Sequence, residues 1–229
     1  MRERRLSSDK DSHMRTGRLP NYSYFRRGRG PKPSGAGGSG LRLKRTSDVI
    51  ISALSIFLLL PAIAAIALII RVCAAKTVLA RPVMLGLYQK PFHRLLFHTD
   101  KAETVAAKVE IGSWLAAFNR FLRLTGFDKL PQLFNVLIGD MSIVGPRPHP
   151  LGLRLGFHLC EKIIPEYRSR FRVRPGLTGL AQISGTDGSD YSVPTVVAES
   201  ELDLKYVREV SFWLDLKIIA KTLADELFA

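Results

Sequence analysis

The feature that most constrains this chain is a long apolar segment, residues 49–72. No charged side chain lies between Asp48 and Arg71, a stretch of 22 residues. At about 1.5 Å per residue, such a helix reaches roughly 33 Å, which is enough to cross the hydrocarbon core of a bilayer. The alternative is a buried helix of a soluble domain, but the length favours a membrane element.

Pro61 lies near the middle of this segment and predicts an interruption there. Inside a helix, proline removes one backbone hydrogen bond and bends the axis. Lys44 and Arg45 precede the segment, and Arg71 and Lys76 follow it. Because basic residues favour the cytoplasmic side of a membrane, this pattern favours a helix that enters one leaflet, breaks at the proline and returns. A simple span, with the later arginine snorkelling on the far side, is the alternative.

The positive charge of the chain is concentrated near its N-terminus. Residues 1–45 hold 13 basic and 3 acidic side chains, so +10 of the formal net charge of +14 lies there. Few apolar residues and many glycines predict a disordered tail over residues 1–41. A basic tail beside a membrane segment favours anionic lipid headgroups as its partner. We therefore expect membrane lipids as partners and no nucleic acid.

The remaining residues predict a helix-rich α/β domain lying against one membrane face. Residues 110–124 carry apolar side chains at helical spacing, with Arg120 and Arg123 between them. This pattern fits either a core helix or a helix in the headgroup layer. Two strand-like runs and a closing helix are expected at residues 81–85, 141–145 and 211–227. The predicted organisation is a tail, a membrane element and a cytoplasmic domain, at residues 1–41, 42–75 and 76–229.

An acidic residue opens a second helical stretch, which runs from Phe127 to Ile138 and ends at Gly139. Proline is tolerated only in the first turn of a helix, so Pro131 places Asp128 at or next to the N-cap. A helix N-terminus offers unpaired N–H donors and partial positive charge, which stabilise a carboxylate or a phosphoryl group. The acid is therefore either a structural cap or a nucleophile that attacks phosphorus to form an acyl phosphate.

Two basic sites further along the chain could neutralise a phosphate, as such a reaction requires. Arg147 lies between two prolines that restrict its backbone, so its guanidinium fork is presented with little entropy left to lose. Arg172 and Arg174 precede a glycine-rich loop. Gly176, Gly179 and Gly185 would let backbone amides approach a diphosphate closely.

The chain resembles the bacterial sugar transferases of exopolysaccharide and capsule assembly in three ordered motifs, FLRLTGFDKLPQLFNVLIGDMSIVGPRPHP, RPGLTGLAQISG and ELDLKYVREVSFWLDLKIIAKTL. These relatives are small polyprenyl-phosphate phosphoglycosyl transferases of the undecaprenyl-phosphate galactose or glucose phosphotransferase type. The resemblance covers about residues 42–225. It implies a monotopic enzyme of the bacterial inner (cytoplasmic) membrane, with a re-entrant helix and a cytoplasmic catalytic domain.

The implied reaction moves a sugar-1-phosphate from a UDP-sugar to undecaprenyl phosphate, releases UMP and initiates a polysaccharide repeat unit. Other polysaccharide-assembly proteins are then expected as partners. By the resemblance, Asp128 matches the aspartate that becomes phosphoglycosylated, Arg147 a phosphate-holding arginine, and Arg123 an arginine just upstream of the catalytic acid. Pro61 matches the helix-breaking proline. Arg174 is added to the phosphate-binding candidates because of its charge and its place before the glycine-rich loop.

The chain departs from the family at three positions close to the expected chemistry. Lys129 stands where the family has a glutamate that helps to hold Mg²⁺, and Leu96 and His98 stand where lysine and arginine are expected. The expected Mg²⁺ site therefore loses charge and a ligand, which leaves Asp128 as its candidate ligand. Lys129 could instead supply a fixed positive charge to the diphosphate. The alternative is a catalytically degenerate paralogue that acts as a membrane scaffold or regulator of polysaccharide synthesis.

Overall fold

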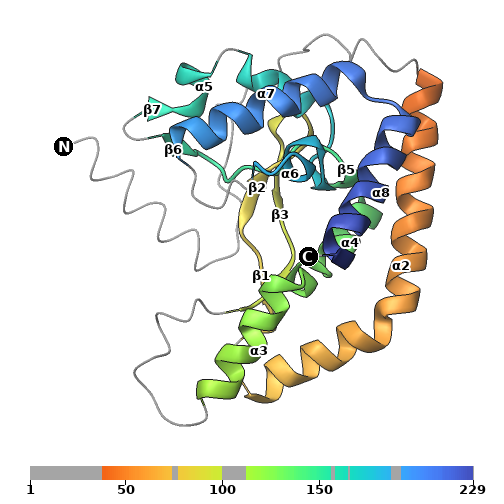
Figure 1. Cartoon of the computed structure of the whole chain (residues 1–229), viewed down its shortest axis with the longest axis vertical. Coiled ribbons are helices and arrows are strands. Elements are labelled where there is room, and N and C mark those ends of the chain that lie inside the picture. The colour runs from red at the N-terminus through yellow and green to blue at the C-terminus, as the bar shows by residue number, and fades with distance from the viewer. Residues whose placement is uncertain are drawn as a thin grey trace.

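The computed structural model describes residues 38–73, 77–99, 112–155, 158–164, 166–186 and 192–228. Over these residues the protein is helix-rich, with one long N-terminal helix lying along an α/β domain (Figure 1). The predicted tail falls almost entirely outside the described residues. The long apolar helix begins at residue 38, earlier than the boundary at residue 42 that composition predicts for the membrane element.

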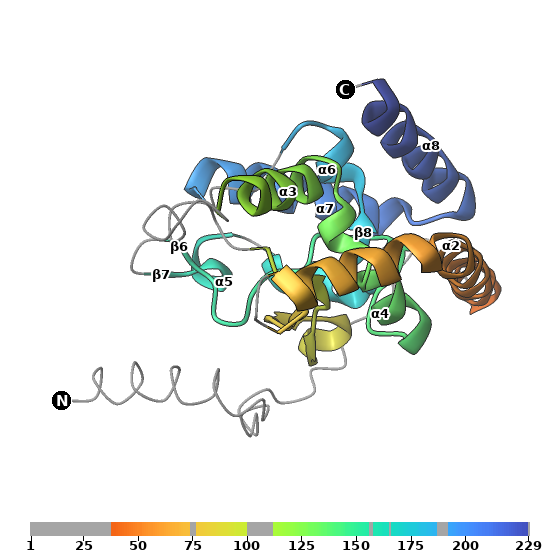
Figure 2. The same cartoon turned by 90° about the horizontal axis from the view of Figure 1, so that it is seen from below.

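The long helix α2 (Gly38–Cys73) has 36 residues and contains Pro61. From Arg42 to Cys73 it is long and apolar enough to cross a membrane. Phe57 and Leu58 are 78% and 74% exposed, as lipid-facing side chains would be. The ribbon bends in its second half, which runs in a different direction from the first half, seen nearly end-on in Figure 2. The helix therefore bends but stays continuous through the proline, so the predicted break is corrected to a bend.

The first half of α2 is fastened to the domain by buried charges. Lys44 Nζ lies 2.6 Å from Asp215 of α8 (Phe212–Phe228). Asp48 accepts hydrogen bonds from the hydroxyl of Ser142 at 2.7 Å and the N–H of Ile143 at 3.1 Å, both in β5 (Ser142–Val144). Buried charges are tolerated only when they are paired in this way. The charges that flank the apolar segment thus serve the packing of the helix against the domain.

The next basic residue of α2, Arg45, closes the end of another helix. Its Nη1 and Nη2 donate to the carbonyls of Val136 at 2.7 Å and Leu137 at 3.0 Å, in the last turn of α4 (Gln132–Ile138). Gly139 follows with φ 103°, the left-handed conformation common after a helix end. A cation at a helix C-terminus also opposes the negative end of the helix dipole. The predicted end of this helix at the glycine is confirmed.

The second half of α2 also packs against the domain. Ile66 and Ile70 are buried in an apolar cluster with Phe97 of β4 (Leu96–Phe97) and Leu122 of α3 (Gly112–Leu124). Leu130, just before α4, packs against the same cluster. Both halves of the helix therefore contact one domain, on either side of the bend.

Four small two-stranded sheets make up the strand structure of the described residues. The antiparallel pairs are β1 (Leu79–Ala80) with β4, β2 (Val83–Leu85) with β3 (Pro91–His93), and β6 (Arg154–Leu155) with β7 (His158–Leu159). The parallel pair is β5 with β8 (Gly176–Thr178), in which Ser142 lies opposite Gly176 and Val144 opposite Thr178. The two predicted strands are confirmed as β2 and β5.

The other helical elements surround these strands. They are η1 (Leu87–Gln89), η3 (Phe127–Lys129), α5 (Cys160–Ile163), η4 (Tyr167–Arg172), α6 (Leu180–Ile183) and α7 (Val193–Glu209). The predicted helices at 110–124 and 211–227 are confirmed as α3 and α8, whereas α7 was not predicted. The central core joins four of the elements through Val136 of α4, Val144 of β5, Tyr206 of α7 and Ile218 of α8.

Candidate active site

Asp128 lies in η3, a short turn that connects α3 to α4. Gly126 has φ 69° and reverses the chain after α3, a conformation that glycine adopts at little cost. Phe121 and Phe127 meet edge to face across this reversal, with ring centroids 6.1 Å apart. The N–H of Lys129 donates to the carbonyl of Gly126 at 2.9 Å and tightens the turn. The turn is thus fixed by a backbone bond and an aromatic contact.

The predicted capping role of Asp128 is corrected by the position of α4. The N-cap of α4 is Pro131, and Asp128 lies three residues before it. Oδ1 of Asp128 is buried and has no hydrogen-bond partner among the described residues. A buried polar atom without a partner costs on the order of 1–3 kcal/mol. This oxygen is therefore not used to hold the helix.

Three cations act on the Asp128 carboxylate. Burial raises the pKa of Asp128 above its usual value, and the positive charges of Lys129, Arg94 and Arg123 oppose that rise. Arg123 lies in the last turn of α3, and Arg94 lies between β3 and β4. The structure thus brings together the three predicted residues Asp128, Arg123 and Lys129. It adds Arg94, which the sequence did not single out.

The segment that carries Arg94 is clamped by a buried side chain of α4. Asn135 Nδ2 donates to the carbonyl of His93 at 2.9 Å, and Asn135 Oδ1 accepts from the N–H of Leu95 at 2.9 Å. These two bonds hold the backbone on both sides of Arg94 against the helix that follows η3. Because Asn135 uses both its amide nitrogen and its amide oxygen, it fixes the position of the backbone between His93 and Leu95.

The other two departures from the family lie in β4, at Leu96, and directly after it, at His98. Leu96 pairs with Ala80 across β1 and β4. The backbone N–H of His98 donates to the carbonyl of Val78 at 2.9 Å. Leu96 carries no charge at the position where the family resemblance expects lysine. The arginine of this segment is Arg94, between β3 and β4.

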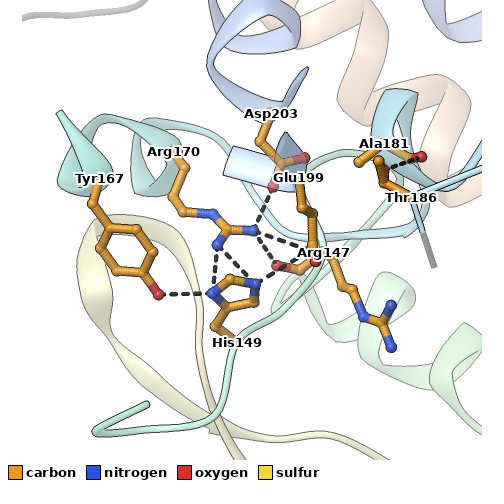
Figure 3. A network of polar contacts seen from close by, with 8 residues as sticks. All are labelled: Arg147, His149, Tyr167, Arg170, Ala181, Thr186, Glu199 and Asp203. Carbon is orange, nitrogen blue, oxygen red and sulfur yellow. Dashed lines mark hydrogen bonds and ion pairs between the residues drawn. The ribbon is translucent and has the colours of Figure 1, made fainter. Parts of the chain in front are cut away.

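Arg147 lies on a loop whose backbone is held at successive carbonyl groups. The N–H of Gly176 donates to the carbonyl of Pro146 at 2.9 Å. Arg170 Nη2 donates to the carbonyl of Arg147 at 3.0 Å. The half-buried Arg147 side chain extends away from the buried side chains beneath the loop (Figure 3). The loop therefore fixes where this guanidinium is presented, as the flanking prolines predict.

A buried polar network supports this loop from beneath (Figure 3). Arg170 of η4 forms an ion pair with Asp203 of α7. Nε2 of His149 donates to Glu199 at 3.2 Å, and the hydroxyl of Tyr167 donates to Nδ1 of His149 at 2.7 Å. Nη1 of Arg170 also contacts the imidazole. All five side chains are nearly or fully buried, and the sequence did not reveal them because each looks like an ordinary surface residue.

The protonation states of the network follow from burial and from Arg170. Burial, with the guanidinium beside it, lowers the pKa of His149 to about 4, so the imidazole is neutral. Burial raises the pKa of Asp203 to about 7, against the attraction of Arg170. Burial would also raise the pKa of Glu199, but the hydrogen bond from His149 and the charge of Arg170 bring it below its usual value. Arg170 is thus balanced by Glu199, with Asp203 taking up a proton near neutrality.

Gly145, Gly176 and Gly179 have a packing role. A Cβ added at Gly145 would lie 2.3 Å from the carbonyl oxygen of Arg174, and one added at Gly179 would lie 2.3 Å from the carbonyl oxygen of Gly145. Glycine at these positions therefore allows the backbones around β5 and β8 to meet. The prediction that these amides approach a diphosphate is wrong for Gly176, whose N–H is bonded to Pro146.

Arg174 lies at the far end of α4 from Asp128. Its Nε donates to the carbonyl of Gly139 at 2.8 Å. Along the helical path this end is on the order of 15 Å from the Asp128 turn. Burial and the nearby Arg45 lower the pKa of Arg174. The contact adds a second cation at the α4 C-terminus, and binding of phosphate by Arg174 stays a prediction.

The residues around Asp128 do not suit the Mg²⁺ that the family resemblance implies. Mg²⁺ takes oxygen ligands, usually from one or two carboxylates with waters and phosphates. Here one carboxylate is accompanied by Lys129, Arg94 and Arg123. No group of three or more His, Cys, Asp or Glu side chains placed to hold a metal occurs within the described residues. The donor set and the surrounding charge both oppose a divalent cation.

The fold thus combines a long apolar helix with a partly buried turn carboxylate and the cations that act on it. Residues 40–228 match the bacterial sugar transferase family. The undecaprenyl-phosphate glucose phosphotransferase of Komagataeibacter xylinus is 37% identical over 191 residues, covering 81% of this chain and 36% of that protein. The exopolysaccharide production protein PSS of Rhizobium leguminosarum bv. phaseoli is 36% identical over 192 residues, which cover 82% of this chain and 96% of that protein.

A third relative is the UDP-glucose:undecaprenyl-phosphate glucose-1-phosphate transferase of Klebsiella pneumoniae, 37% identical over 192 residues, with 81% of this chain and 40% of that protein covered. The chain belongs to the bacterial sugar transferase family. It spans well under half of the Komagataeibacter and Klebsiella proteins and nearly all of the Rhizobium protein.

Proposed function

We propose that this protein transfers a sugar-1-phosphate from a UDP-sugar to undecaprenyl phosphate, as the first step of exopolysaccharide or capsule assembly. The observation that carries the proposal is the buried, unpartnered Oδ1 of Asp128 among three cations. The names of the Komagataeibacter and Klebsiella relatives describe glucose-phosphate transfer involving undecaprenyl phosphate, and that of the Rhizobium relative describes exopolysaccharide production. These names support the same substrate classes here.

In the proposed first step, the Asp128 carboxylate attacks the phosphorus that bears the sugar. The bond from that phosphorus to the bridging oxygen breaks, and UMP leaves with the electron pair. The product is an aspartyl phosphosugar. The cations near Asp128 would hold the phosphate oxygens and balance the charge that grows on the departing phosphate.

In the second step, a phosphate oxygen of undecaprenyl phosphate attacks the same phosphorus. The bond to Asp128 breaks, which releases the polyprenyl diphosphosugar and restores the carboxylate. Neither step consumes a proton overall, so no general base is required. Arg147 would hold a phosphate through its guanidinium fork, because the loop beneath it is fixed by Arg170 and Gly176.

We also propose that α2 enters and leaves the same leaflet, with both ends and the domain on the cytoplasmic face of the inner membrane. A straight helix would place the ends of the apolar segment roughly 33 Å apart, on opposite faces of a bilayer. Here Lys44 pairs with Asp215, while Ile70 packs beside Phe97 and Leu122 of the same domain. The bend seen in Figure 1 supports this arrangement.

Exposed apolar side chains support the placement of the reactive turn at the level of the lipid headgroups. They come from α3, η3 and α4 and are Trp114, Phe121, Leu124, Phe127, Phe134 and Ile138. Aromatic and aliphatic side chains on such helices favour the boundary between headgroups and acyl chains. Asp128 would then lie close to the depth at which the phosphate of a polyprenyl lipid is found.

The activity is tested with the full chain in detergent micelles, supplied with undecaprenyl phosphate and a panel of UDP-sugars. We expect UMP release with at least one UDP-sugar and none when Asp128→Asn replaces the wild type. Binding of both substrates without UMP release from any UDP-sugar would contradict transfer. That result would favour the alternative, a membrane scaffold or regulator that binds without turnover.

The topology is tested with single cysteines introduced by Arg42→Cys and Thr77→Cys, in a background in which Cys73 and Cys160 are replaced by alanine. Both introduced positions are exposed and lie just outside the apolar segment. An impermeant thiol reagent should label both from the cytoplasmic side. Labelling of one position from each side would establish a spanning helix instead.

A further inference from the structure

We propose that Arg94 is a phosphate-binding residue of the transfer site and that, together with Arg123 and Lys129, it takes the place of a divalent cation at the substrate diphosphate. This inference rests on the proposed function and specifies how its substrate is held. It also predicts a departure from a metal-dependent site.

The position of Arg94 is fixed independently of any ligand. Asn135 bonds to the residues on both sides of it, at 2.9 Å in each case. The N–H of Arg94 donates to the carbonyl of Pro82 at 3.0 Å. A segment tied at three successive residues presents its side chain with little backbone freedom, which reduces the entropy lost when a phosphate binds.

The same segment is joined to the Asp128 turn by apolar contacts. Phe97, three residues after Arg94, is buried in the cluster that also contains Leu122 of α3. Leu130, two residues after Asp128, packs against this cluster. The β3–β4 connection, the end of α3 and η3 therefore form one packed unit, in which Arg94 and Arg123 approach the carboxylate from two different elements.

The charge of this unit suits a diphosphate. A UDP-sugar carries two negative charges on its diphosphate, and a further negative charge develops as UMP departs. Two guanidinium forks can bind phosphate oxygens in pairs, and an ammonium adds a point charge. Arg94, Arg123 and Lys129 thus act as three positive charges on the carboxylate of Asp128, where a divalent cation would bring two.

The proposal is tested by the binding of UDP, which requires no transfer. Calorimetric titration of the full chain in detergent micelles should give the same affinity, within about twofold, in EDTA and in MgCl₂. Arg94→Gln should weaken UDP binding at least tenfold in both buffers, with partial recovery in Arg94→Lys. Arg208→Gln is the matched control, because Arg208 is exposed and pairs with Glu166. It should bind UDP as the wild type does.

A second test asks whether Lys129→Glu makes UDP binding depend on Mg²⁺. Lys129→Glu should bind UDP weakly in EDTA and recover in MgCl₂, because the carboxylate both removes a cation and offers a magnesium ligand. Thermal unfolding of each variant in the same micelles checks that the fold is retained. Wild-type UDP binding that disappears in EDTA would overturn the proposal. It would also be overturned by wild-type affinity in Arg94→Gln, or by wild-type affinity of Lys129→Glu in EDTA.

The same samples separate this proposal from the proposed function. UMP release from UDP-glucose, in the presence of undecaprenyl phosphate, is measured in both buffers. If UDP binding follows the expected pattern without UMP release, the cationic phosphate site stands and the transfer reaction fails. If UMP release occurs but depends on Mg²⁺, the transfer stands and the replacement of the metal by Arg94, Arg123 and Lys129 is refuted.

Discussion

Two clusters of charged side chains, one beneath Arg147 and one around Asp128, differ in burial and in charge balance. In the first, Arg170 is 1% exposed and is matched by Glu199 and Asp203, which are fully buried. In the second, the half-buried Asp128 is surrounded by cations, and one of its oxygens has no hydrogen-bond partner within the described structure. The first cluster contains the acids that pair with its arginine, and in the second three cations act on one carboxylate.

This difference distinguishes a cluster that stabilises the fold from a cluster that takes part in the proposed reaction. A charge removed from water must be neutralised within the fold, or the fold is destabilised. Positive charge at a partly exposed turn can instead act on an anionic substrate. The two clusters are linked through the loop at residues 146–148, because Arg170 holds the carbonyl of Arg147. One cluster fixes the fold, and the other performs the proposed chemistry.

The largest expected change in stability comes from removing the cation of the buried network. Arg170→Met would leave Glu199 and Asp203 buried without their partner, which typically costs about 3–5 kcal/mol. The control is Arg208→Gln, which breaks a pair with Glu166 whose side chains are 66% and 61% exposed and should cost less than about 1 kcal/mol. Denaturant unfolding in micelles measures both. Equal losses would show that the network does not stabilise the fold.

A smaller change is expected from the histidine of the same network. Its pKa is about 4 in the fold and about 6.5 in the unfolded chain, so its contribution is present above pH 6.5 and is lost as pH falls toward 4. The cost of His149→Gln should therefore shrink by about 2 kcal/mol between pH 7 and pH 4.5. Unfolding of both proteins at both pH values measures this.

The stability of His149→Gln is compared with that of the wild type because Asp203 also makes stability depend on pH. Its raised pKa, about 7, means that its contribution is lost as pH rises from its unfolded value toward 7, opposite in sign to that of His149. This contribution is present in both the wild type and the variant, so the comparison isolates the histidine to first order. A cost of His149→Gln that is independent of pH would show that the imidazole is not held neutral.

The smallest expected change is in the activity of an Arg147 variant, which tests how the buried network serves the reaction through the loop that it holds. Arg147→Lys keeps the charge but loses the bidentate fork. UMP release should fall by about tenfold, equivalent to about 1.4 kcal/mol, while stability stays near that of the wild type because the Arg170 contact is with the backbone carbonyl. Steady-state kinetics and unfolding of the same sample measure both quantities. Unchanged turnover would assign Arg147 a structural role.

Local patterns in the sequence predicted much of the fold. The long helix α2 follows from its uninterrupted apolar run, α3 and α8 from apolar periodicity, β2 and β5 from short strand-like runs, and the end of α4 from Gly139. Helix α7 was missed because its buried face includes Glu199, Ser200 and Asp203, so it lacks an apolar stripe. The two acids are paired by Arg170 and His149, which reach Asp203 and Glu199 from segments 33 and 50 residues away. Periodicity carries no information about such long-range pairs.

The residues of the candidate site were likewise predictable where they are close in the sequence and missed where they come from a distant segment. Asp128, Lys129 and Arg123 are neighbours along the chain, so sequence reasoning placed them together. Arg94 comes from a separate segment, which is held in place by Asn135 from 40 and 42 residues away. One signal was present, since Arg94 lies two residues before Leu96, and alternate residues of an extended chain share a face. It could have been considered as a replacement for the missing lysine.

The central claim is that Asp128 carries the sugar phosphate during transfer. Its most direct measurement is the intact mass of the full chain after incubation with UDP-glucose and without undecaprenyl phosphate. We expect a covalent hexose-phosphate adduct on the wild type, which disappears when the lipid phosphate is added. Asp128→Asn should be folded and carry no adduct. UMP release without an adduct at any time point, or an adduct that persists in Asp128→Asn, would contradict the account.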